Sequence, residues 1–512
     1  MNWPMLHPLI LSVYPVLFLY SVNAGQMRFF DAAAIALCSL CVTVSILWLI
    51  LKLLKNKEKA SLLVSGFCFM FFAYGAFYEM LRGVFENDSI RNFWLPIFWF
   101  AGWLFSVFVV LRSRQDTSAA TLFLNVLSVV LFLFLSVNIV GSYWRSCQHH
   151  AFSAGLADAK TSETALKRSL PDIYYIILDG YARNDVLKSL YGYDNSGFID
   201  FLAKSGFRVA SESCANYCQT YLSLASSLNF SYLDHLQREY RDVNNDQPLI
   251  EMIAKNQVFA TLKKNGYKTI AFSSGYTGTE LREADIYFSR SMLSREFIDL
   301  LLNSTYLSAM KFSFFDAAET RADVHRERVK DVFNSLGSFE LPPEPVVLFA
   351  HVLCPHPPFV FGPAGEKRRL TERFNYSDGS HWGSDSEKYR RQYRDQLVYI
   401  NSLLQQSIDR LLADTEREKI IILQSDHGPG SGLKWQDPDA TDLFERMSVF
   451  YAVYFADADY RYFYDSITPV NTFRIIFNRL FNAELPLLDD KSYFSPWFGR
   501  YRFVDVTSKV KR

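Results

Sequence analysis

An aspartate and a histidine lie next to each other in Ser425-Asp426-His427-Gly428, directly after an apolar stretch of the sequence. That stretch, residues 419–424, is rich in isoleucine and predicts a buried strand of a parallel sheet. The glycines and proline of 428–430 then turn the chain away from the strand. Open α/β sheets bind their ligands at the carboxyl ends of the strands. A carboxylate beside an imidazole at such an end could supply half of a metal site, although the pair could also be a capping aspartate and a surface histidine.

Two other segments place reactive side chains at comparable positions. Asp179 follows the apolar run 172–178, which also predicts a buried strand, and Gly180 comes next. Thr220 opens a run of small and apolar residues at helical spacing, so we place it at or near a helix N-terminus. An Asp-Gly pair after a strand can be only a turn, and a threonine that opens a helix can be its N-cap. The combination, in this order and at element ends, favours a functional site.

These side chains would suit one divalent cation and a nucleophile. Asp179 and Asp426 offer hard oxygen ligands, and His427 adds a nitrogen. The Thr220 hydroxyl is a poor nucleophile by itself, but coordination to a metal lowers the pKa of a hydroxyl. A helix N-terminus would attract an anionic substrate through its N–H groups and its dipole. We therefore expect Thr220 to attack phosphorus and form a phospho-threonine intermediate, with the metal neutralising charge on the phosphoryl oxygens.

Composition divides the chain into a membrane part and a soluble part. Of the 512 residues, 53 are Lys or Arg and 53 are Asp or Glu, so the net charge gives no indication of a nucleic-acid partner. Hydrophobic residues reach 50%, and they concentrate in roughly the first 145 residues. Five apolar runs of about 20 residues each predict membrane spans there. They are 6–23, 32–51, 61–78, 92–111 and 120–143.

The charges of the loops predict the orientation of these spans. Four lysines lie between 52 and 59, and Arg112 and Arg114 follow the fourth run. The positive-inside rule places both connections in the cytoplasm. An odd number of spans then exports everything after Trp144, which in a bacterium means the periplasm or the outer face of the cytoplasmic membrane. The first run lacks a basic n-region and a cleavage site, so we interpret it as an uncleaved helix and not as a signal peptide.

The sequence after the spans predicts a linker over 145–170 and one α/β domain over 171–512, behind the five-helix membrane domain 1–144. Apolar runs that predict strands alternate with helical patterns, which favours a largely parallel sheet. Strands are predicted at 172–178, 206–210, 268–273, 345–353, 417–424 and 447–455, and helices at 194–204, 250–265, 294–311, 319–335, 385–413 and 470–482. Four cysteines fall in the exported part, and their pairing stays open, Cys214–Cys218 being the nearest candidate beside free thiols. They are Cys147, Cys214, Cys218 and Cys354.

Asp179-Gly after a strand, Asn216-Tyr-Cys-Gln-Thr220, and Ser-Asp426-His427-Gly together resemble the alkaline phosphatase/sulfatase superfamily. The resemblance is closest to its membrane-anchored branch of lipoteichoic acid synthases and phosphoethanolamine transferases, which also have five spans, a linker and an extracytoplasmic sulfatase-like domain. It implies a multi-span helical membrane domain followed by a sulfatase-like α/β domain with a mostly parallel sheet.

The resemblance also implies roles for individual residues. Asp179, Thr220, Asp426 and His427 would hold the metal, with Thr220 as nucleophile and Asp179 where the family often has glutamate. His356, in Pro355-His-Pro-Pro after a strand, looks like the histidine that contacts substrate or protonates a leaving group. His351 is a further candidate for substrate binding, and His381 a weaker one. The cofactor would be a divalent metal ion, Mn²⁺, Mg²⁺ or Zn²⁺.

The implied function is transfer of a phosphoglycerol or phosphoethanolamine group from a membrane phospholipid, through Thr220, to a cell-envelope glycan or lipid. Phosphoglycerol is the slight favourite, by analogy alone. A sulfatase-like phosphodiesterase or phosphatase, and an inactive sulfatase-fold assembly partner in the membrane, are the alternatives. The Cys/Ser-x-Pro-x-Arg pattern of true sulfatases does not occur in the chain. Gly428-Pro-Gly-Ser-Gly432 lacks the Gly-Lys-Ser/Thr ending of a nucleotide-binding loop.

Overall fold

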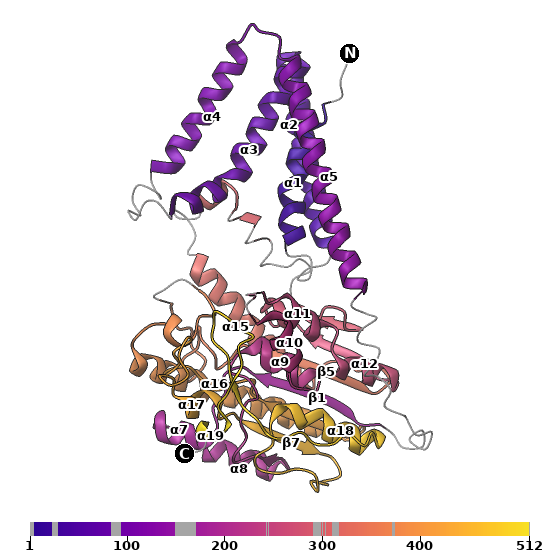
Figure 1. The fold of residues 1–512 in the computed structure, drawn as a ribbon, viewed down its shortest axis with the longest axis vertical. Helices are drawn as coiled ribbons and strands as arrows, with labels where there is room; N and C mark the ends of the chain where they lie inside the picture. Colours follow the sequence, from indigo (N-terminus) through magenta and orange to yellow (C-terminus); the bar gives the residue numbers. More distant parts are fainter. Residues whose placement is uncertain are drawn as a thin grey trace. The chain divides into compact units, whose positions relative to one another are not determined.

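The computed structural model divides into two compact units (Figure 1). Met1–Gly155 and Ser291–Ala317 form the first, which we call the membrane unit, and Leu156–Arg290 and Ala318–Arg512 form the second, which we call the catalytic unit. The structure describes residues 5–22, 29–82, 94–148, 170–241, 243, 245–289, 298, 301–302, 304–309, 317–370 and 374–510. Most of the linker predicted over 145–170 lies outside the described residues, and the predicted domain limits stay a prediction.

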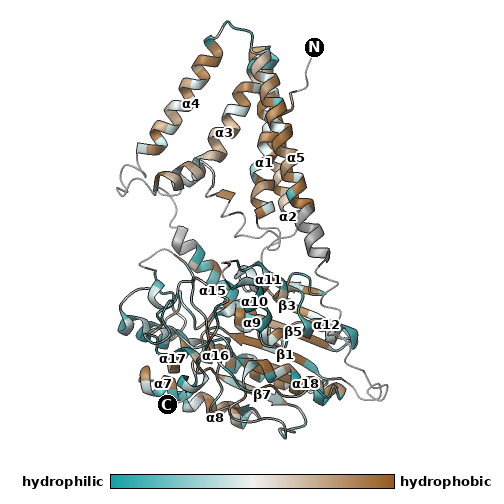
Figure 2. Cartoon of the chain, viewed as in Figure 1, coloured by the Kyte–Doolittle hydropathy of each residue, from teal (hydrophilic) through white to brown (hydrophobic). Residues whose placement is uncertain are grey.

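Five apolar helices make up the described N-terminal part of the membrane unit, and hydrophobic residues cover most of their length (Figure 2). They are α1 (His7–Val22), α2 (Phe29–Leu54), α3 (Lys57–Arg82), α4 (Leu95–Arg112) and α5 (Ser118–Gln148). The last four contain stretches that are long and apolar enough to cross a membrane. Helix α1 has 16 residues, so it rises only about 24 Å against a hydrocarbon core of about 30 Å. That α1 forms a fifth span stays a prediction.

A short segment around Tyr306, from the middle of the sequence, packs among these helices. The Tyr306 backbone N–H donates to the Phe71 carbonyl of α3 at 2.7 Å, and its hydroxyl donates to the Pro96 carbonyl of α4 at 3.1 Å. The Tyr306 and Tyr74 rings meet edge to face at 5.2 Å between centroids. Leu301 is buried in a cluster with side chains of α1 and α2. The segment thus contacts α3 and α4 through Tyr306, and α1 and α2 through Leu301. These contacts explain why it groups with the membrane unit.

The catalytic unit is built on a seven-stranded sheet within the described residues, with the strand order β2-β7-β6-β1-β5-β3-β4. The strands are β1 (Asp172–Leu178), β2 (Arg208–Val209), β3 (Lys268–Phe272), β4 (Ile286–Phe288), β5 (Val346–Val352), β6 (Lys419–Gln424) and β7 (Tyr451–Phe455). Strand β1 pairs in parallel with β5 and with β6, and β3 pairs in parallel with β4 and with β5. Only β7 and β2 add antiparallel pairs to this ladder. The prediction of an α/β domain with a mostly parallel central sheet is confirmed.

Burial on both faces explains why the central strands are apolar throughout. Every residue of β1, β5 and β6 is buried. Along β1, Tyr174, Ile176 and Leu178 belong to one hydrophobic core, and Ile173, Tyr175 and Ile177 belong to the other. Helices α15 (Ala317–Ser335) and α16 (Ser386–Ala413) contribute to the first core, and α9 (Thr220–Leu228) and α18 (Thr472–Phe481) to the second. Helices on both faces leave no polar side for these strands.

The structure differs from the predicted elements where a side chain caps a helix. The helix predicted over 250–265 is two helices, α11 (Gln247–Ala254) and α12 (Gln257–Lys264), because Asn256 accepts the Phe259 N–H and starts α12 anew. The strand predicted over 447–455 begins only at 451. Met447 ends the short helix α17 (Leu443–Met447), which Asp442 caps, and Ser448 and Val449 form only isolated bridges, to Cys214 and Ala182. Cys214, Cys218 and Cys354 carry free thiols, so the structure contains no Cys214–Cys218 disulfide.

The contacts of Tyr306 predict a graded loss of stability in the full-length protein. Tyr306→Phe keeps the ring contacts but removes the hydrogen bond to Pro96, which should cost about 1 kcal/mol. Tyr306→Ala removes both and, because the ring is only half-buried, should cost roughly 2–3 kcal/mol. Thermal unfolding in detergent should therefore rank the wild type above the Phe variant and the Phe variant above the Ala variant. Tyr462→Ala, at a side chain that is 56% exposed, serves as the control, and a Tyr306→Ala protein as stable as this control would contradict the prediction.

Candidate active site

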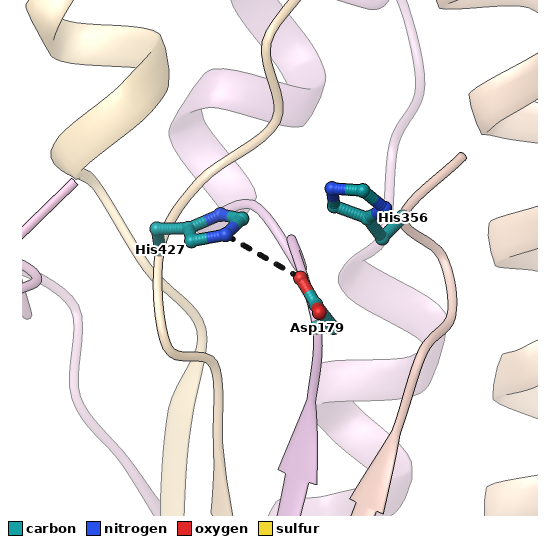
Figure 3. A group of neighbouring side chains, drawn as sticks. All are labelled: Asp179, His356 and His427. Carbon is teal, nitrogen blue, oxygen red and sulfur yellow. Dashed lines mark ion pairs between the residues drawn. The ribbon is translucent and has the colours of Figure 1, made fainter. Parts of the chain in front are cut away.

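Neighbouring strands bring the predicted residues to one edge of the sheet. Asp179 follows β1, His356 lies in the turn after β5, and Asp426 and His427 follow β6. Strands β6, β1 and β5 are adjacent and parallel, so their carboxyl ends meet. Figure 3 shows the side chains of Asp179, His356 and His427 gathered at this edge. Thr220, the first residue of α9, also reaches this edge.

The distances among these side chains match those of ligands that share one ion. His427 Nε2 lies 3.5 Å from Asp179 Oδ1 and 3.3 Å from Asp426 Oδ2. Thr220 Oγ1 lies 3.1 Å from the same nitrogen. Ligands placed tetrahedrally around a zinc-sized cation at about 2.0–2.1 Å are separated from one another by about 3.3–3.4 Å. Among the described residues, potential ligand atoms lie within 4.8 Å of one another in two sets, Asp179 with His356 and His427, and Asp179 with His351 and Asp426. Asp179 belongs to both sets, so a cation bound at this edge of the sheet would contact it.

The buried carboxylates of Asp179 and Asp426 each have one oxygen that makes no hydrogen bond among the described residues and that a bound cation could contact. Asp179 and Asp426 are 1% and 0% exposed. Asp426 Oδ1 accepts the Gly180 N–H at 3.2 Å, but Asp179 Oδ1 and Asp426 Oδ2 have no hydrogen-bond partner among the described residues. A buried, unpaired carboxylate oxygen is costly, and two such oxygens on one site repel each other. The residues therefore fit a divalent metal ion, as the sequence predicted.

The protonation states also suit a metal site. His427 Nδ1–H donates to the Gly428 carbonyl at 3.0 Å, which leaves the Nε2 lone pair toward the carboxylates. Burial, reinforced by the charge of Arg446, lowers the pKa of His427, so the ring is neutral at neutral pH. Burial opposes ionisation of Asp179, but nearby histidines, His356 foremost, outweigh it and hold the pKa of Asp179 below its usual value. A neutral imidazole and an ionised carboxylate are the forms that bind metal.

Thr220 is a helical residue and does not act as the N-cap of α9. The N-cap is Gln219, which has an extended backbone and makes no capping hydrogen bond through its side chain. Gln219 instead donates its side-chain amide to the Ser495 carbonyl at 2.8 Å. The Thr220 hydroxyl is thus directed at His427 Nε2, and the N–H groups of the first helical turn have no partner inside the helix. This position suits a nucleophile that attacks an anionic group.

His351 lies behind Asp179. Its Nε2 is 3.2 Å from Asp179 Oδ2, and its Nδ1 is 2.8 Å from the Thr279 hydroxyl. Because a carboxylate only accepts hydrogen bonds, we assign the proton to Nε2, which then holds Asp179 in place. His351 is 1% exposed and is not among the residues that line the cavity described below. Its position fits an orienting role better than the substrate contact predicted from sequence.

His356 faces a second buried carboxylate that sequence analysis missed. Its Nδ1–H donates to the Pro357 carbonyl at 2.6 Å, and its Nε2 lies 3.7 Å from Asp378 Oδ2. Asp378 is 3% exposed. Burial opposes its ionisation, but Arg446 and then His356 outweigh burial and lower the pKa of Asp378. One ring nitrogen of His356 is therefore held by a backbone carbonyl, and the other faces Asp378 on the wall of the cavity.

Arg446 joins the loops that carry the site. This side chain is 1% exposed. Its Nη1 donates to Asp378 Oδ2 at 2.5 Å and to the Gly428 carbonyl at 2.9 Å, and its Nε donates to the Cys218 carbonyl at 2.9 Å. One guanidinium thus fixes the turn after His427 and the segment just before Thr220. Its charge also favours an anionic substrate.

Two glycines permit these close approaches. Gly180 has φ +71°, which a side chain rarely adopts. A Cβ at Gly428 would lie 2.0 Å from the Glu445 carbonyl oxygen. The glycine of the Asp179-Gly motif is thus required by its backbone conformation, and the glycine of the Asp-His427-Gly motif by the close approach of a neighbouring backbone.

A cavity of about 260 Å³ opens beside the site. Its walls include Asp179, Thr220, His356 and His427, together with the missed residues Asp378, Arg446, Trp435, Trp497 and Arg500. His381 lines it too and stacks on Trp435 at 5.7 Å between ring centroids. The missed residues lie in loops or in the short helix α17, without the strand-end position that made the others recognisable. The volume suits a head group better than a whole lipid.

The sequence profile of the sulfatase family matches residues 171–472, which is more than half of the chain. No curated protein matches the chain by sequence.

Several solved structures are similar to the chain at low identity. The C-terminal periplasmic domain of EcEptC from Escherichia coli is 12% identical, covering 68% of this chain and 95% of that chain at a TM-score of 0.42. The integral membrane protein lipooligosaccharide phosphoethanolamine transferase A (EptA) from Neisseria meningitidis is 10% identical. The match covers 93% of this chain and 95% of that chain at a TM-score of 0.37. The phosphonate monoester hydrolase of Agrobacterium radiobacter is 14% identical. The match covers 64% of this chain and 80% of that chain at a TM-score of 0.39. The family assignment rests on the sequence match.

The unpaired oxygens predict which variants lose metal. Asp179→Asn and Asp426→Asn keep the side-chain shape but remove the charge, so affinity should fall by more than the roughly 10- to 100-fold caused by losing an outer-shell partner. The full-length protein, stripped with chelator and dialysed against Zn²⁺ or Mn²⁺, should retain about one ion per chain by elemental analysis. Asp439→Asn, at an exposed side chain, should behave like the wild type. Full metal content in both site variants would refute a shared cation.

Proposed function

This chain belongs to the sulfatase family, and from that premise we propose that it is a phosphotransferase that acts on a membrane phospholipid. The head group, as phosphoglycerol or phosphoethanolamine, passes through Thr220 to a glycan or lipid of the cell envelope. The observation that carries the proposal is the position of Thr220. Its hydroxyl lies 3.1 Å from His427 Nε2, beside two buried carboxylates, on the wall of a cavity the size of a head group.

In the first step, Thr220 Oγ1 forms a bond to phosphorus and the bond from phosphorus to the diacylglycerol oxygen breaks. The hydroxyl proton passes from Thr220 to solvent water, and His356, protonated on both ring nitrogens, donates its Nε2 proton to the departing oxygen, so that diacylglycerol leaves neutral. In the second step, an acceptor hydroxyl attacks the same phosphorus and gives its proton to His356 Nε2, the bond from phosphorus to Thr220 Oγ1 breaks, and Thr220 takes a proton back from solvent water. Arg446 and the first-turn N–H groups of α9 hold the anionic phosphoryl oxygens in both steps.

Asp179, Asp426, His427 and Thr220 would hold the divalent ion, for which Mn²⁺, Mg²⁺ and Zn²⁺ are the candidates. When bound, it would lower the pKa of the Thr220 hydroxyl and offset negative charge on phosphorus. His351 would keep Asp179 oriented toward it.

The charges of the cavity favour phosphoglycerol as the transferred group. An ammonium is stabilised by a free carboxylate or an open aromatic face. Asp378 is paired with Arg446, and the guanidinium groups of Arg446 and Arg500 each lie 5.2 Å from a tryptophan ring centroid, Trp435 and Trp497 respectively. A neutral group with hydroxyls meets no repulsion there.

The site has to work at the membrane. We propose that the chain resides in the bacterial cytoplasmic membrane as a multi-pass protein with its catalytic unit outside the cytoplasm, as the loop charges predict. Its apolar helices keep it where phospholipid head groups are abundant.

The nucleophile predicts a covalent intermediate. After exposure of the full-length protein with Mn²⁺ to phosphatidylglycerol or phosphatidylethanolamine, without acceptor, mass spectrometry should find the phospho-head-group adduct on Thr220. Thr220→Ala should show none, because it removes the hydroxyl that lies against His427. Thr261→Ala, a half-buried threonine of α12, should form the adduct normally. An adduct that persists in Thr220→Ala would overturn the assignment.

Donor preference and reaction type can be read from the released lipid. Labelled phosphatidylglycerol should release diacylglycerol on the order of tenfold faster than labelled phosphatidylethanolamine, since the cavity disfavours an ammonium. Release that depends on an acceptor glycan supports transfer. Free glycerol phosphate formed at the same rate without acceptor would instead favour the hydrolase.

A further inference from the structure

A turn next to the cavity has an unusual sequence, Trp497-Phe-Gly-Arg-Tyr-Arg-Phe503, in which every residue except glycine is aromatic or arginine. It connects β8 (Tyr493–Phe494) with β9 (Val504–Asp505), which pair as an antiparallel hairpin. The Arg502 N–H donates to the Gly499 carbonyl at 2.8 Å, and Gly499 has φ +83°. The chain therefore reverses tightly, with Phe498 at the tip.

The base of the turn is firmly held, whereas its tip is exposed. Tyr501 is 0% exposed and its hydroxyl donates to the Asn245 carbonyl at 2.6 Å. Arg500 is 6% exposed and pairs with Asp246. Phe498, by contrast, is 65% exposed. A fixed scaffold thus presents a large apolar ring to its surroundings.

The tip adjoins the site. Trp497 is half-buried and lines the cavity, as does Arg500. Val504, just after the turn, is 41% exposed, and Phe503 is half-buried. Phe498 therefore directly follows a residue of the cavity wall, and its exposed ring continues the apolar surface of Trp497 outward from the cavity.

We propose that this turn inserts Phe498 and the edge of Trp497 into the head-group region of the bilayer in which the chain is embedded. Tryptophan concentrates at membrane interfaces, phenylalanine is among the apolar side chains that interfacial segments bury there, and arginines near the surface are attracted by anionic lipid phosphates. Within the described residues, four helices are long and apolar enough to cross a membrane, so the chain is expected to be anchored in a bilayer. The turn would hold the cavity against the lipid surface, and only this last consequence rests on the proposed function.

The exposed Tyr462 supplies a matched control. It is 56% exposed and lies beside Arg461, whose guanidinium is 5.9 Å from its ring centroid. It thus has the same aromatic and arginine chemistry on the same unit, but it does not line the cavity.

Depth-dependent quenching tests the insertion without any need for activity. Phe498→Cys and Tyr462→Cys are labelled with an environment-sensitive fluorophore in the full chain, reconstituted in vesicles of phosphatidylcholine and phosphatidylglycerol. The parent chain, labelled in the same way, corrects for its own seven cysteines. The label at 498 should emit blue-shifted light and be quenched by head-group and shallow acyl spin labels, and the label at 462 should not. Solvent-like emission at 498, or blue-shifted emission without quenching by lipid spin labels, which would mean a protein contact, would overturn the proposal.

A kinetic measurement extends the test to catalysis. Phe498→Ser should raise the apparent KM for donor lipid in vesicles on the order of tenfold while leaving kcat, and the rate with a dispersed short-chain donor, unchanged. Equal effects on both donors would contradict membrane docking. Because quenching is independent of turnover, a quenched label in a protein that releases no diacylglycerol would support the docking and count against the proposed function alone.

Discussion

The most demanding feature of this catalytic unit is a pair of buried carboxylates, each with one oxygen that has no hydrogen-bond partner among the described residues. Asp179 Oδ1 and Asp426 Oδ2 approach the same imidazole nitrogen, and neither has a hydrogen bond within the described structure. Such an arrangement is unfavourable unless positive charge lies between them. The adjacent parallel strands bring them together, and the two glycines allow the turns that aim them. A cation bound between them would therefore stabilise this form of the fold.

Other buried charges around the site are neutralised within the protein. Arg446 pairs with Asp378 and also donates to backbone carbonyls from two separate segments. His351 restrains Asp179 from behind, and Thr279 restrains His351 in turn. The positions of the Thr220 hydroxyl and of His427 therefore depend on a network of mutually restrained side chains. Networks of this kind rigidify a site when they are complete.

The chain passes between its two units three times, after residues 155, 290 and 317. The middle excursion includes Tyr306, whose contacts to α3 and α4 are made in part through backbone carbonyls. The apolar turn at Phe498 would add a contact that the helices alone do not provide.

The sequence by itself determined the apolar helices, the alternation of strands and helices, and the residues at strand ends. Periodicity and apolar runs encode these features locally, so Asp179, Thr220, Asp426 and His427 could be chosen from their neighbours in the chain alone. It did not determine the breaks at Asn256 and Asp442, because a single capping hydrogen bond competes there with the local pattern. Nor could it identify Asp378, Arg446 or the cavity wall at Trp497. Those residues come from loops far apart in the chain, and only the packing of the sheet and helices decides which buried charge meets which.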